Sequence, residues 1–183
     1  KLDILINNAG DSSPWVLLTE TEPSSWWNTM EVNLKGPYLL LHAFLPLLVE
    51  TAEANKTTVD VLNVSSIGAH TTSPGASAYQ ISKLAVLRLT EFVDAEFGQQ
   101  GVNAIALHPG GVKTELARKR TPFLSHLLND TSDLCGGFVV WLTKGARTWL
   151  AGRYVSATWD VEKLESMREE IVAGDKLKVR LVV

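Results

Sequence analysis

Three side chains in the middle of the chain have the types and the spacing to move a proton on and off a carbonyl oxygen. Tyr79 and Lys83 are four residues apart, and Ser66 lies thirteen residues before the tyrosine. Residues four apart on a helix share a face, with Cβ atoms about 5–6 Å apart. A free tyrosine titrates near ~10, and a nearby cation lowers an acid's pKa by about 1–3 units. The trio predicts general acid/base chemistry, with Lys83 depressing the pKa of Tyr79.

The elements that must position this trio alternate between short apolar strands and longer helices. Strands are predicted at Leu2–Ile6, Val59–Val64, Val102–Leu107 and Arg153–Ala157. Helices are predicted at Ser24–Thr51, Ala78–Phe97, Ser132–Lys144 and Asp160–Ala173. Short runs rich in Val, Ile and Leu are typical of buried parallel strands. The alternation predicts an α/β doubly wound parallel sheet, in one domain over residues 1–183.

Two helices carry further local signals. The long first helix is predicted to bend near Gly36-Pro37 or at Pro46, because proline disrupts the helical hydrogen-bond ladder. The second begins with Ser77-x-x-Gln80, the spacing of a capping box in which each side chain bonds the other residue's backbone.

Each of the first three strands is followed by a loop of small or special residues. These loops are Asn7–Gly10, Ser65–Gly68 and His108–Gly111. Ligands of open α/β sheets bind beyond the carboxyl ends of the strands, and glycine lets a ligand approach the backbone closely. The alternative is that the glycines only make tight turns. Although His70 and His108 fall near this region, no second ligand stands at metal spacing, so no metal site is predicted.

Together, these motifs resemble those of the short-chain dehydrogenase/reductase family. The resemblance extends from Lys1 to about Ala157 and rests on five motifs in order: Asn7-Asn8-Ala9-Gly10, Val32-Asn33-Leu34-Lys35-Gly36, Asn63-Val64-Ser65-Ser66, Tyr79-x-x-x-Lys83 and Pro109-Gly110-Gly111-Val112-Lys113-Thr114. It implies a Rossmann-type sheet that binds NAD or NADP. It also implies hydride transfer between a carbonyl and a hydroxyl group of a small-molecule substrate.

The resemblance also implies a role for each catalytic residue. Tyr79 would be the general acid/base, donating a proton to a carbonyl or accepting one from a hydroxyl. Lys83 would depress the pKa of Tyr79 and hydrogen-bond the nicotinamide ribose. Ser66, which has the family's separation from the tyrosine, would hold the substrate oxygen. Asn33 would anchor a water that links Lys83 to solvent.

The resemblance places further residues at the cofactor. Besides Tyr79 and Lys83 these are Asn8, Ala9, Gly10, Pro109, Gly110, Val112 and Thr114. The first three would lie beneath the adenosine, and Pro109, Gly110 and Val112 would flank the nicotinamide. Thr114 would bind the carboxamide or a phosphate oxygen.

Several of these positions have a structural interpretation as well. Asn8 could tie the central sheet together, and Thr114 could cap a helix beginning at the next residue. Asn33 could compensate for backbone groups left unpaired where its helix kinks, which is compatible with its functional role. Gln80 and Ser82 are interpreted as surface or packing positions.

Three segments are expected to form the substrate pocket: Asp11–Trp15, Ala69–Pro74 and Glu115–Asp130. The last has little periodicity and contains Pro122, which favours a mobile lid. Such loops determine the substrate range, so steroids, sugars, fatty-acyl chains, polyketides and small ketones all stay open.

One motif of the family is not found in this sequence. The family begins with a strand, a Gly-x-x-x-Gly-x-Gly turn and a helix that receive the pyrophosphate, and no such turn occurs among the 13 glycines. With strand order 3-2-1-4-5-6-7, we expect a fragment that supplies strands four to seven, leaving Leu2–Ile6 as an exposed apolar edge. We expect this chain alone to bind dinucleotide poorly, and the NAD or NADP preference is not readable.

Composition narrows the partners and the compartment. The 183 residues are 45% apolar and 20% charged, with a net charge of −3 and one basic cluster at Arg118–Arg120, so no nucleic-acid partner is predicted. The one cysteine, Cys135, fits a reducing compartment, and the protein is predicted to be cytoplasmic. The longest apolar run, Tyr38–Val49, is shorter than the ~20 residues of a membrane span, so no membrane association is predicted.

Apolar residues on both sides of the helices at 24–51 and 78–97 predict a homo-oligomer. Two alternatives to a working enzyme stay open. One is a catalytically inactive truncated subunit that pairs with intact subunits. The other is a dinucleotide-binding or regulatory protein of the same fold, although such a protein needs no proton relay.

Overall fold

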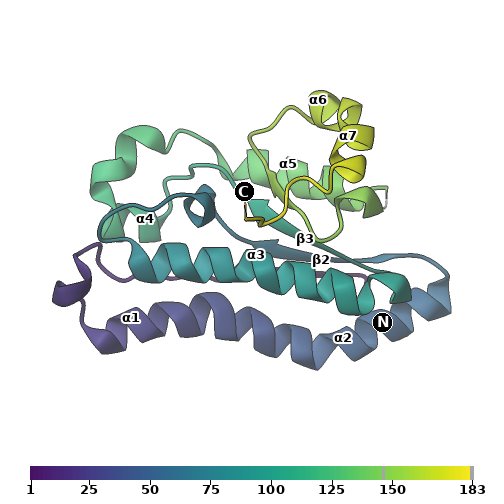
Figure 1. Ribbon diagram of the computed structural model, residues 1–183, viewed down its shortest axis with the longest axis horizontal. Helices are drawn as coiled ribbons and strands as arrows, with labels where there is room; N and C mark the ends of the chain where they lie inside the picture. The colour runs from purple at the N-terminus through teal and green to yellow at the C-terminus, as the bar shows by residue number, and fades with distance from the viewer. Residues whose placement is uncertain (146, 182–183) are drawn as a thin grey trace.

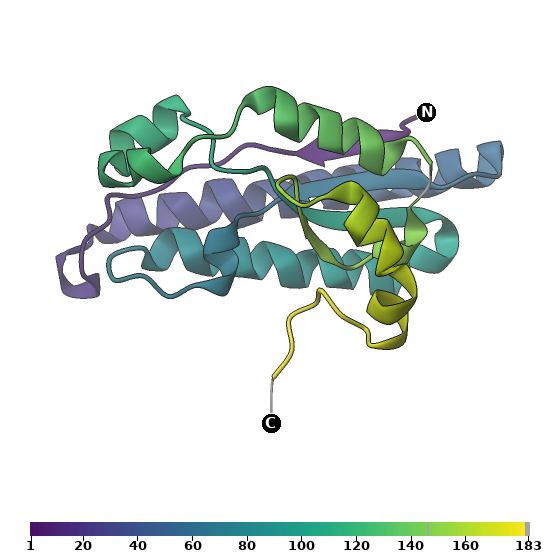
Figure 2. The ribbon, with the colours of Figure 1, turned by 90° about the horizontal axis from the view of Figure 1, so that it is seen from above.

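The computed structural model describes residues 1–145 and 147–181 and has a four-stranded parallel sheet at its centre. The strands are β1 (Ile4–Asn7), β2 (Val59–Val64), β3 (Val102–His108) and β4 (Tyr154–Ser156). They lie side by side in chain order, and every pair is parallel. All four predicted strands are therefore present, and the predicted α/β class is confirmed. β1 forms one edge of the sheet, and the C-terminal segment lies beyond the opposite edge (Figure 2).

Helices cover both faces of the sheet, because successive strand residues point to opposite faces. Val59 and Val61 of β2 pack with α2 (Gly36–Asn55) and α3 (Ser77–Phe97). Leu62 of β2, together with Ile105 and Leu107 of β3, packs on the other face against α5 (Ser132–Thr143). Figure 1 shows the two layers, with α2 and α3 on one side of the strands and α5 on the other. Both faces are buried at β2 and β3, as the continuous apolar runs predicted.

Close to where a bend was predicted, the long first helix contains a turn of π-helix. The run comprises α1 (Pro23–Met30), the π-helical Glu31–Lys35 (η2), and α2, which continues without a break through Pro46 (Figure 1). The π turn ends just before Gly36, next to one of the two predicted positions, and a π turn is a common cause of a kink.

The same run, Pro23–Asn55, is long and apolar enough to cross a membrane by length and composition, with a mean hydropathy of 1.3 over an 18-residue window. These two properties do not distinguish a membrane span from the core helix of a globular protein. Leu41, Leu45 and Leu48 are buried against the sheet, whereas Tyr38 and Leu40 on the opposite face are exposed.

Shorter elements complete the described chain. They are η1 (Leu18–Glu20), η3 (Ile67–His70), η4 (Gly98–Gln100), α4 (Glu115–Arg120), η5 (Pro122–Leu127), η6 (Thr148–Leu150), α6 (Val161–Ser166) and α7 (Arg168–Ala173). The expected lid is therefore largely helical. The prediction of a single helix at Asp160–Ala173 is wrong in one respect. The structure has two helices there, α6 and α7, which are separated by Met167.

The predicted capping box at the start of α3 is wrong. The N-cap is Ala76, without a side-chain hydrogen bond. Ser77 Oγ instead accepts a hydrogen bond of 3.0 Å from Trp26 Nε1, and Gln80 Oε1 accepts one of 2.8 Å from the backbone of Ser73. Both side chains are used in tertiary contacts, and Gln80 is buried rather than at the surface.

The edge of the sheet at β1 is open in the part of the chain that the structure describes, where β1 pairs with β2 alone. Ile4 and Ile6 are 42% and 43% exposed. The expectation of an exposed apolar edge is confirmed.

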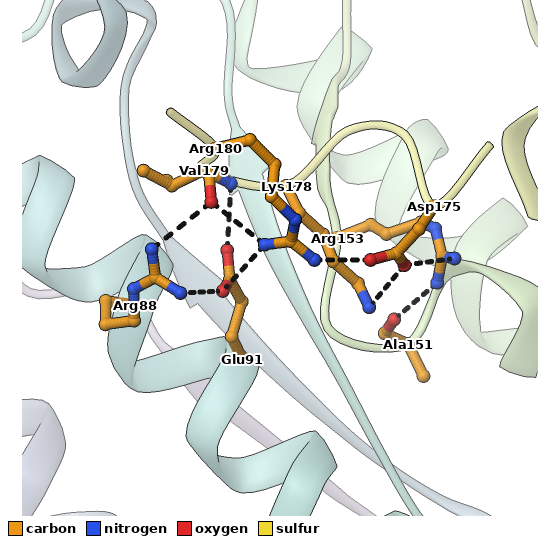
Figure 3. Close-up of polar contacts among 8 residues, drawn as sticks. All are labelled: Arg88, Glu91, Ala151, Arg153, Asp175, Lys178, Val179 and Arg180. Atoms are coloured by element: carbon orange, nitrogen blue, oxygen red, sulfur yellow. Dashed lines mark hydrogen bonds and ion pairs between the residues drawn. The ribbon is translucent and has the colours of Figure 1, made fainter. Parts of the chain in front are cut away.

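Ion pairs hold the C-terminal segment against α3 and β4 (Figure 3). The Val179 amide donates to Glu91 Oε1 at 2.9 Å, and Arg180 pairs with both Glu91 and Asp175. Arg153, which leads into β4, reaches Asp175 at 3.2 Å. The segment therefore packs along the outer side of β4, away from β1.

Candidate active site

Ser66 and Tyr79 meet beyond the carboxyl end of β2. Ser66 follows the strand and is the N-cap of η3, and Tyr79 lies on the first turn of α3. A Cβ added at Gly68 would stand 3.3 Å from Ser66 Oγ and 3.5 Å from Tyr79 Cε1. The bare glycine therefore leaves room for hydroxyl and phenol to approach. Burial raises the pKa of Tyr79, and a hydrogen bond with Ser66 lowers it in part.

Lys83 lies below the phenol but does not set its pKa as predicted. Its Nζ is 5.8 Å from the centroid of the Tyr79 ring and donates a hydrogen bond of 2.9 Å to the Val64 carbonyl. Burial lowers the pKa of Lys83 to about 8. The expected depression of the Tyr79 pKa by Lys83 is wrong for this structure, because desolvation of the phenol dominates. At neutral pH the site thus contains a neutral phenol and a buried ammonium.

Ser65 anchors Lys83 rather than facing the phenol. Its buried hydroxyl donates a hydrogen bond of 2.9 Å to the backbone carbonyl of Lys83. Lys83 Nζ in turn bonds the residue before Ser65. These two contacts join α3 to the end of β2. The arrangement agrees with the choice of Ser66, rather than Ser65, as the serine that faces the tyrosine.

Asn33 lies within the π turn and braces the loop after β1. Its Oδ1 accepts from the Asp11 amide at 2.7 Å, and its Nδ2 donates to the Asp11 carbonyl at 2.8 Å and to Ser82 Oγ at 2.9 Å. Asn33 therefore hydrogen-bonds backbone groups of this loop, and not backbone groups of its own helix as suggested. Ser82 is fully buried, so the packing interpretation of that residue holds and the surface one does not.

The side chains of Asn33 and Lys83 both lie close to Gly10. A Cβ at Gly10 would stand 3.5 Å from Lys83 Nζ and 3.6 Å from Asn33 Oδ1. The glycine therefore leaves a small space lined by an ammonium and an amide oxygen, and a polar group that approaches the loop could use both. Asn8, Ala9 and Gly10 are all exposed.

Asn8 was suggested to tie the sheet together, but in the structure Asn7 does so. Asn7 Nδ2 donates to Asn63 Oδ1 at 2.7 Å, and Asn63 Nδ2 donates to Thr90 Oγ1 at 2.9 Å. All three side chains are buried. The strand period contained this signal, since Asn7 is the last residue of β1 and its register partner is Asn63.

In the loop after β3, the glycines accommodate the chain itself. Gly110 has φ +91°, and a Cβ there would stand 2.8 Å from Asp130 Oδ2. Gly111 N donates to that oxygen at 2.6 Å, and Asp130 N donates to the Gly111 carbonyl at 3.0 Å. The turn interpretation thus explains Gly110. Asp130 was predicted only as the end of a pocket segment. Its contact with this loop was not predicted, because only the fold brings it back beside the loop, where it pairs with Val112.

The two walls of the expected pocket touch through aromatic rings. Trp15, which follows β1, packs edge-on against Phe123 of η5 with ring centroids 5.6 Å apart. Thr114 caps α4, because its Oγ1 accepts from the Ala117 amide at 3.2 Å. The structural interpretation of Thr114 is confirmed, and Pro109 and Val112 lie in the loop just before it.

The two histidines near the site make different contacts. His108 Nδ1 accepts a hydrogen bond of 3.2 Å from the Ile67 amide. His70 packs edge-on against Tyr154 with centroids 4.4 Å apart. Over residues 1–145 and 147–181, no cluster of three or more His, Cys, Asp or Glu side chains could hold a metal ion.

This fold is that of short-chain dehydrogenases. The sequence profile of the family described as short chain dehydrogenase matches residues 1–124, and the chain belongs to that family. It is 55% identical over its whole length to short chain dehydrogenase mpl6 of Monascus purpureus and to citE of Monascus ruber. It spans 61% of the length of each of these relatives.

Solved structures with the same fold include cofactor complexes. A gluconate 5-dehydrogenase from Burkholderia cenocepacia J2315, in complex with NADP and tartrate, aligns with 84% of this chain and 62% of its own, with a TM-score of 0.74 and 26% identity. A 3-ketoacyl-(acyl-carrier-protein) reductase from Brucella melitensis, complexed with NADH, covers 85% of this chain and 65% of its own, with a TM-score of 0.75 and 25% identity.

Proposed function

We propose that the protein is an NAD(P)-dependent oxidoreductase that interconverts a carbonyl and a hydroxyl group, with Tyr79 as the general acid/base. The observation that carries this proposal is the convergence of Ser66, Tyr79 and Lys83 beyond the end of β2. A protein that only bound a dinucleotide would have no use for a neutral phenol beside a hydroxyl and an ammonium. Membership of the short chain dehydrogenase family supports the same reaction class.

In this proposal each side chain has one task. Ser66 donates a hydrogen bond to the substrate oxygen and orients it toward Tyr79. Because burial keeps the pKa of Tyr79 high, its phenol is protonated and suited to donate to the oxygen of a carbonyl under reduction. The Lys83 ammonium, on the same face of α3, stabilises the phenolate that this transfer creates.

The residues around Gly10 fit a nicotinamide cofactor. The space that a Cβ at Gly10 would fill is lined by Lys83 Nζ and Asn33 Oδ1, a donor and an acceptor suited to ribose hydroxyls. The exposed backbone of residues 8–10 and the segment 109–112 would hold the remainder. When bound, NAD or NADP would supply the hydride. NADP in the gluconate 5-dehydrogenase complex and NADH in the reductase complex leave both cofactors open.

The test is Tyr79→Phe in the natural protein, with Tyr38→Phe as the matched control. Tyr38 is an exposed tyrosine on α2, so its substitution removes a phenol hydroxyl that belongs to none of the proposed catalytic residues. Removal of the Tyr79 hydroxyl should lower kcat by about 10²–10⁴-fold, the usual contribution of a general acid, with dinucleotide affinity unchanged. Equal turnover of the Tyr79→Phe variant and the control would refute the acid/base role. Loss of dinucleotide affinity together with turnover would indicate a binding role.

We also propose that the protein pairs with a second copy through α2 and α3. Large apolar side chains are exposed on both helices, among them Leu40, Phe44, Leu84 and Phe92. Between the helices runs a groove of about 690 Å³ that is lined mainly by apolar residues. A contiguous apolar face on two neighbouring helices suits the self-complementary interface of a two-fold dimer. Light scattering should give a dimer that Phe92→Asp converts to a monomer; a wild-type monomer would refute the pairing.

A further inference from the structure

We propose that His108 is a positioning residue that holds the Ser66 turn in place through the Ile67 amide. The inference rests on the proposed function, because Ser66 matters only if it orients a substrate oxygen. His108 is the last residue of β3, and Ile67 is the first residue of η3, immediately after Ser66. The side chain of His108 thus bridges the loops that follow two neighbouring strands.

The geometry makes this hydrogen bond the contact that fixes the turn. The first amides of a helical turn have no partner within it. Here the Gly68 amide donates to Ser66 Oγ at 3.0 Å, and the Ala69 amide donates to the Ser66 carbonyl at 3.0 Å. The Ile67 amide comes before both of them and donates to His108 Nδ1 at 3.2 Å. Since the Ile67 side chain is 60% exposed, apolar packing does little to hold this residue.

The bond depends on the charge of His108. A histidine nitrogen accepts a hydrogen bond only when it carries no proton, so Nδ1 must be bare and Nε2 protonated. A second proton on the ring would remove the acceptor and turn attraction into repulsion. The positioning contact therefore exists only while the imidazole is neutral.

The surroundings of the ring favour the neutral form. Burial is the main cause that lowers the pKa of His108 below 6.5; a positive charge on His70 lowers it further, and the Asp130 carboxylate raises it. His70 belongs to the same turn as Ile67, and Asp130 comes from the segment that covers Gly111. On β4 the register partner is the uncharged Ser156. The contact should be intact at pH 7 and be lost as the pH falls through the lowered pKa.

The test compares His108→Asn with His108→Gln in the 183-residue chain. The Asn oxygen occupies the place of Nδ1 and can accept from Ile67, whereas the Gln side chain places its polar atoms near the position of Nε2. Both variants are neutral amides at the same strand end, so they form a matched pair. The readout is hydrogen exchange of the Ile67 amide by NMR, corrected for intrinsic rates.

We expect the Asn variant to keep the protection of wild type, and the Gln variant to exchange about five-fold faster, the effect of one typical hydrogen bond. In wild type, protection should fall as the pH drops below 6.5, and in the Asn variant it should not. Equal exchange in the two variants, or wild-type protection that is constant down to pH 4, would overturn the proposal. The wild-type pH series needs no variant to fold.

A second measurement separates this inference from the proposed function. In the natural protein, assayed with a carbonyl substrate and with both NADH and NADPH, the acid limb of kcat should be weakened in His108→Asn and present in wild type. If the exchange pattern holds but no variant of the natural protein, wild type included, turns over, the reaction class is wrong and the positioning of Ser66 stands. If turnover is present and the exchange pattern fails, only the role of His108 is wrong.

Discussion

Replacing Lys83 with methionine should stabilise the fold at neutral pH while removing a residue of the proposed reaction. The Lys83 side chain is only 4% exposed, and burial lowers its pKa from 10.5 to about 8. At ~1.4 kcal/mol for each pH unit, that lowering corresponds to about 3 kcal/mol of unfavourable free energy for the charged form in the folded state. Methionine carries no charge and is close to lysine in length.

One hydrogen bond opposes this gain. Lys83 Nζ donates to the Val64 carbonyl, which methionine would leave without that donor. Such a loss costs about 1 kcal/mol, so the net gain for Lys83→Met should be roughly 2 kcal/mol at pH 7.

The pH dependence of the gain follows from linkage. The folded pKa is about 8 and the unfolded one 10.5, so between these values the unfolded chain binds more protons. In that window the stability of wild type rises with pH, and that of the variant lacks this rise. The advantage of Lys83→Met is therefore full below pH 8, shrinks as the pH rises, and reverses to a loss of about 1 kcal/mol above pH 10.5.

The assay is urea unfolding of wild type and variant at several pH values from 7 to 10.5. Lys163→Met is the control, because Lys163 is an exposed lysine on α6. The control should leave the unfolding free energy within about 0.5 kcal/mol of wild type. A Lys83→Met variant that is less stable than wild type at pH 7, or whose difference does not change with pH, would refute the reasoning.

Three further substitutions test the packing, two of them near the site and one in α5. Asn63→Ala should cost about 2–3 kcal/mol because it leaves a buried Asn7 amide unpaired, and the melting temperature should fall by roughly 5–10 °C; an unchanged value would mean that the amide finds another partner. Gly110→Ala should cost about 1–3 kcal/mol, since Gly110 has φ +91° and faces Asp130 Oδ2. Gly136→Ala in α5, where a Cβ would meet nothing within 4 Å, should instead stabilise by about 0.5–1 kcal/mol; equal effects of the two glycine changes would contradict the steric argument.

The sequence predicted the architecture because local pattern determines it. The apolar runs at Val59–Val64 and Val102–Leu107 are strands in the structure, and Ala78–Phe97 lies within α3. Buried parallel strands need apolar side chains on both faces, so the pattern is readable without the fold. The four-residue spacing of Tyr79 and Lys83 likewise placed both on one face of a helix.

Errors arose where a residue had a choice between a local and a distant partner. Ser77 and Gln80 have capping-box spacing, but Ser77 bonds Trp26, 51 residues away, and Gln80 bonds the backbone of Ser73 in the loop before the helix. Asp130 follows β3 by more than twenty residues, and nothing in its neighbourhood along the chain indicates that it returns to Gly111. Partners so distant in sequence are chosen by tertiary packing.

The sequence by itself determined the elements, their order and the residues of the trio, because side-chain periodicity and spacing are properties of neighbours along the chain. The tertiary structure decided the electrostatics of the site. The pKa of Tyr79 is raised rather than lowered, since burial of the phenol outweighs its hydrogen bond with Ser66, and the Lys83 ammonium turns to the Val64 carbonyl. Desolvation depends on what the whole fold packs around a group, and no spacing within a single helix contains that information.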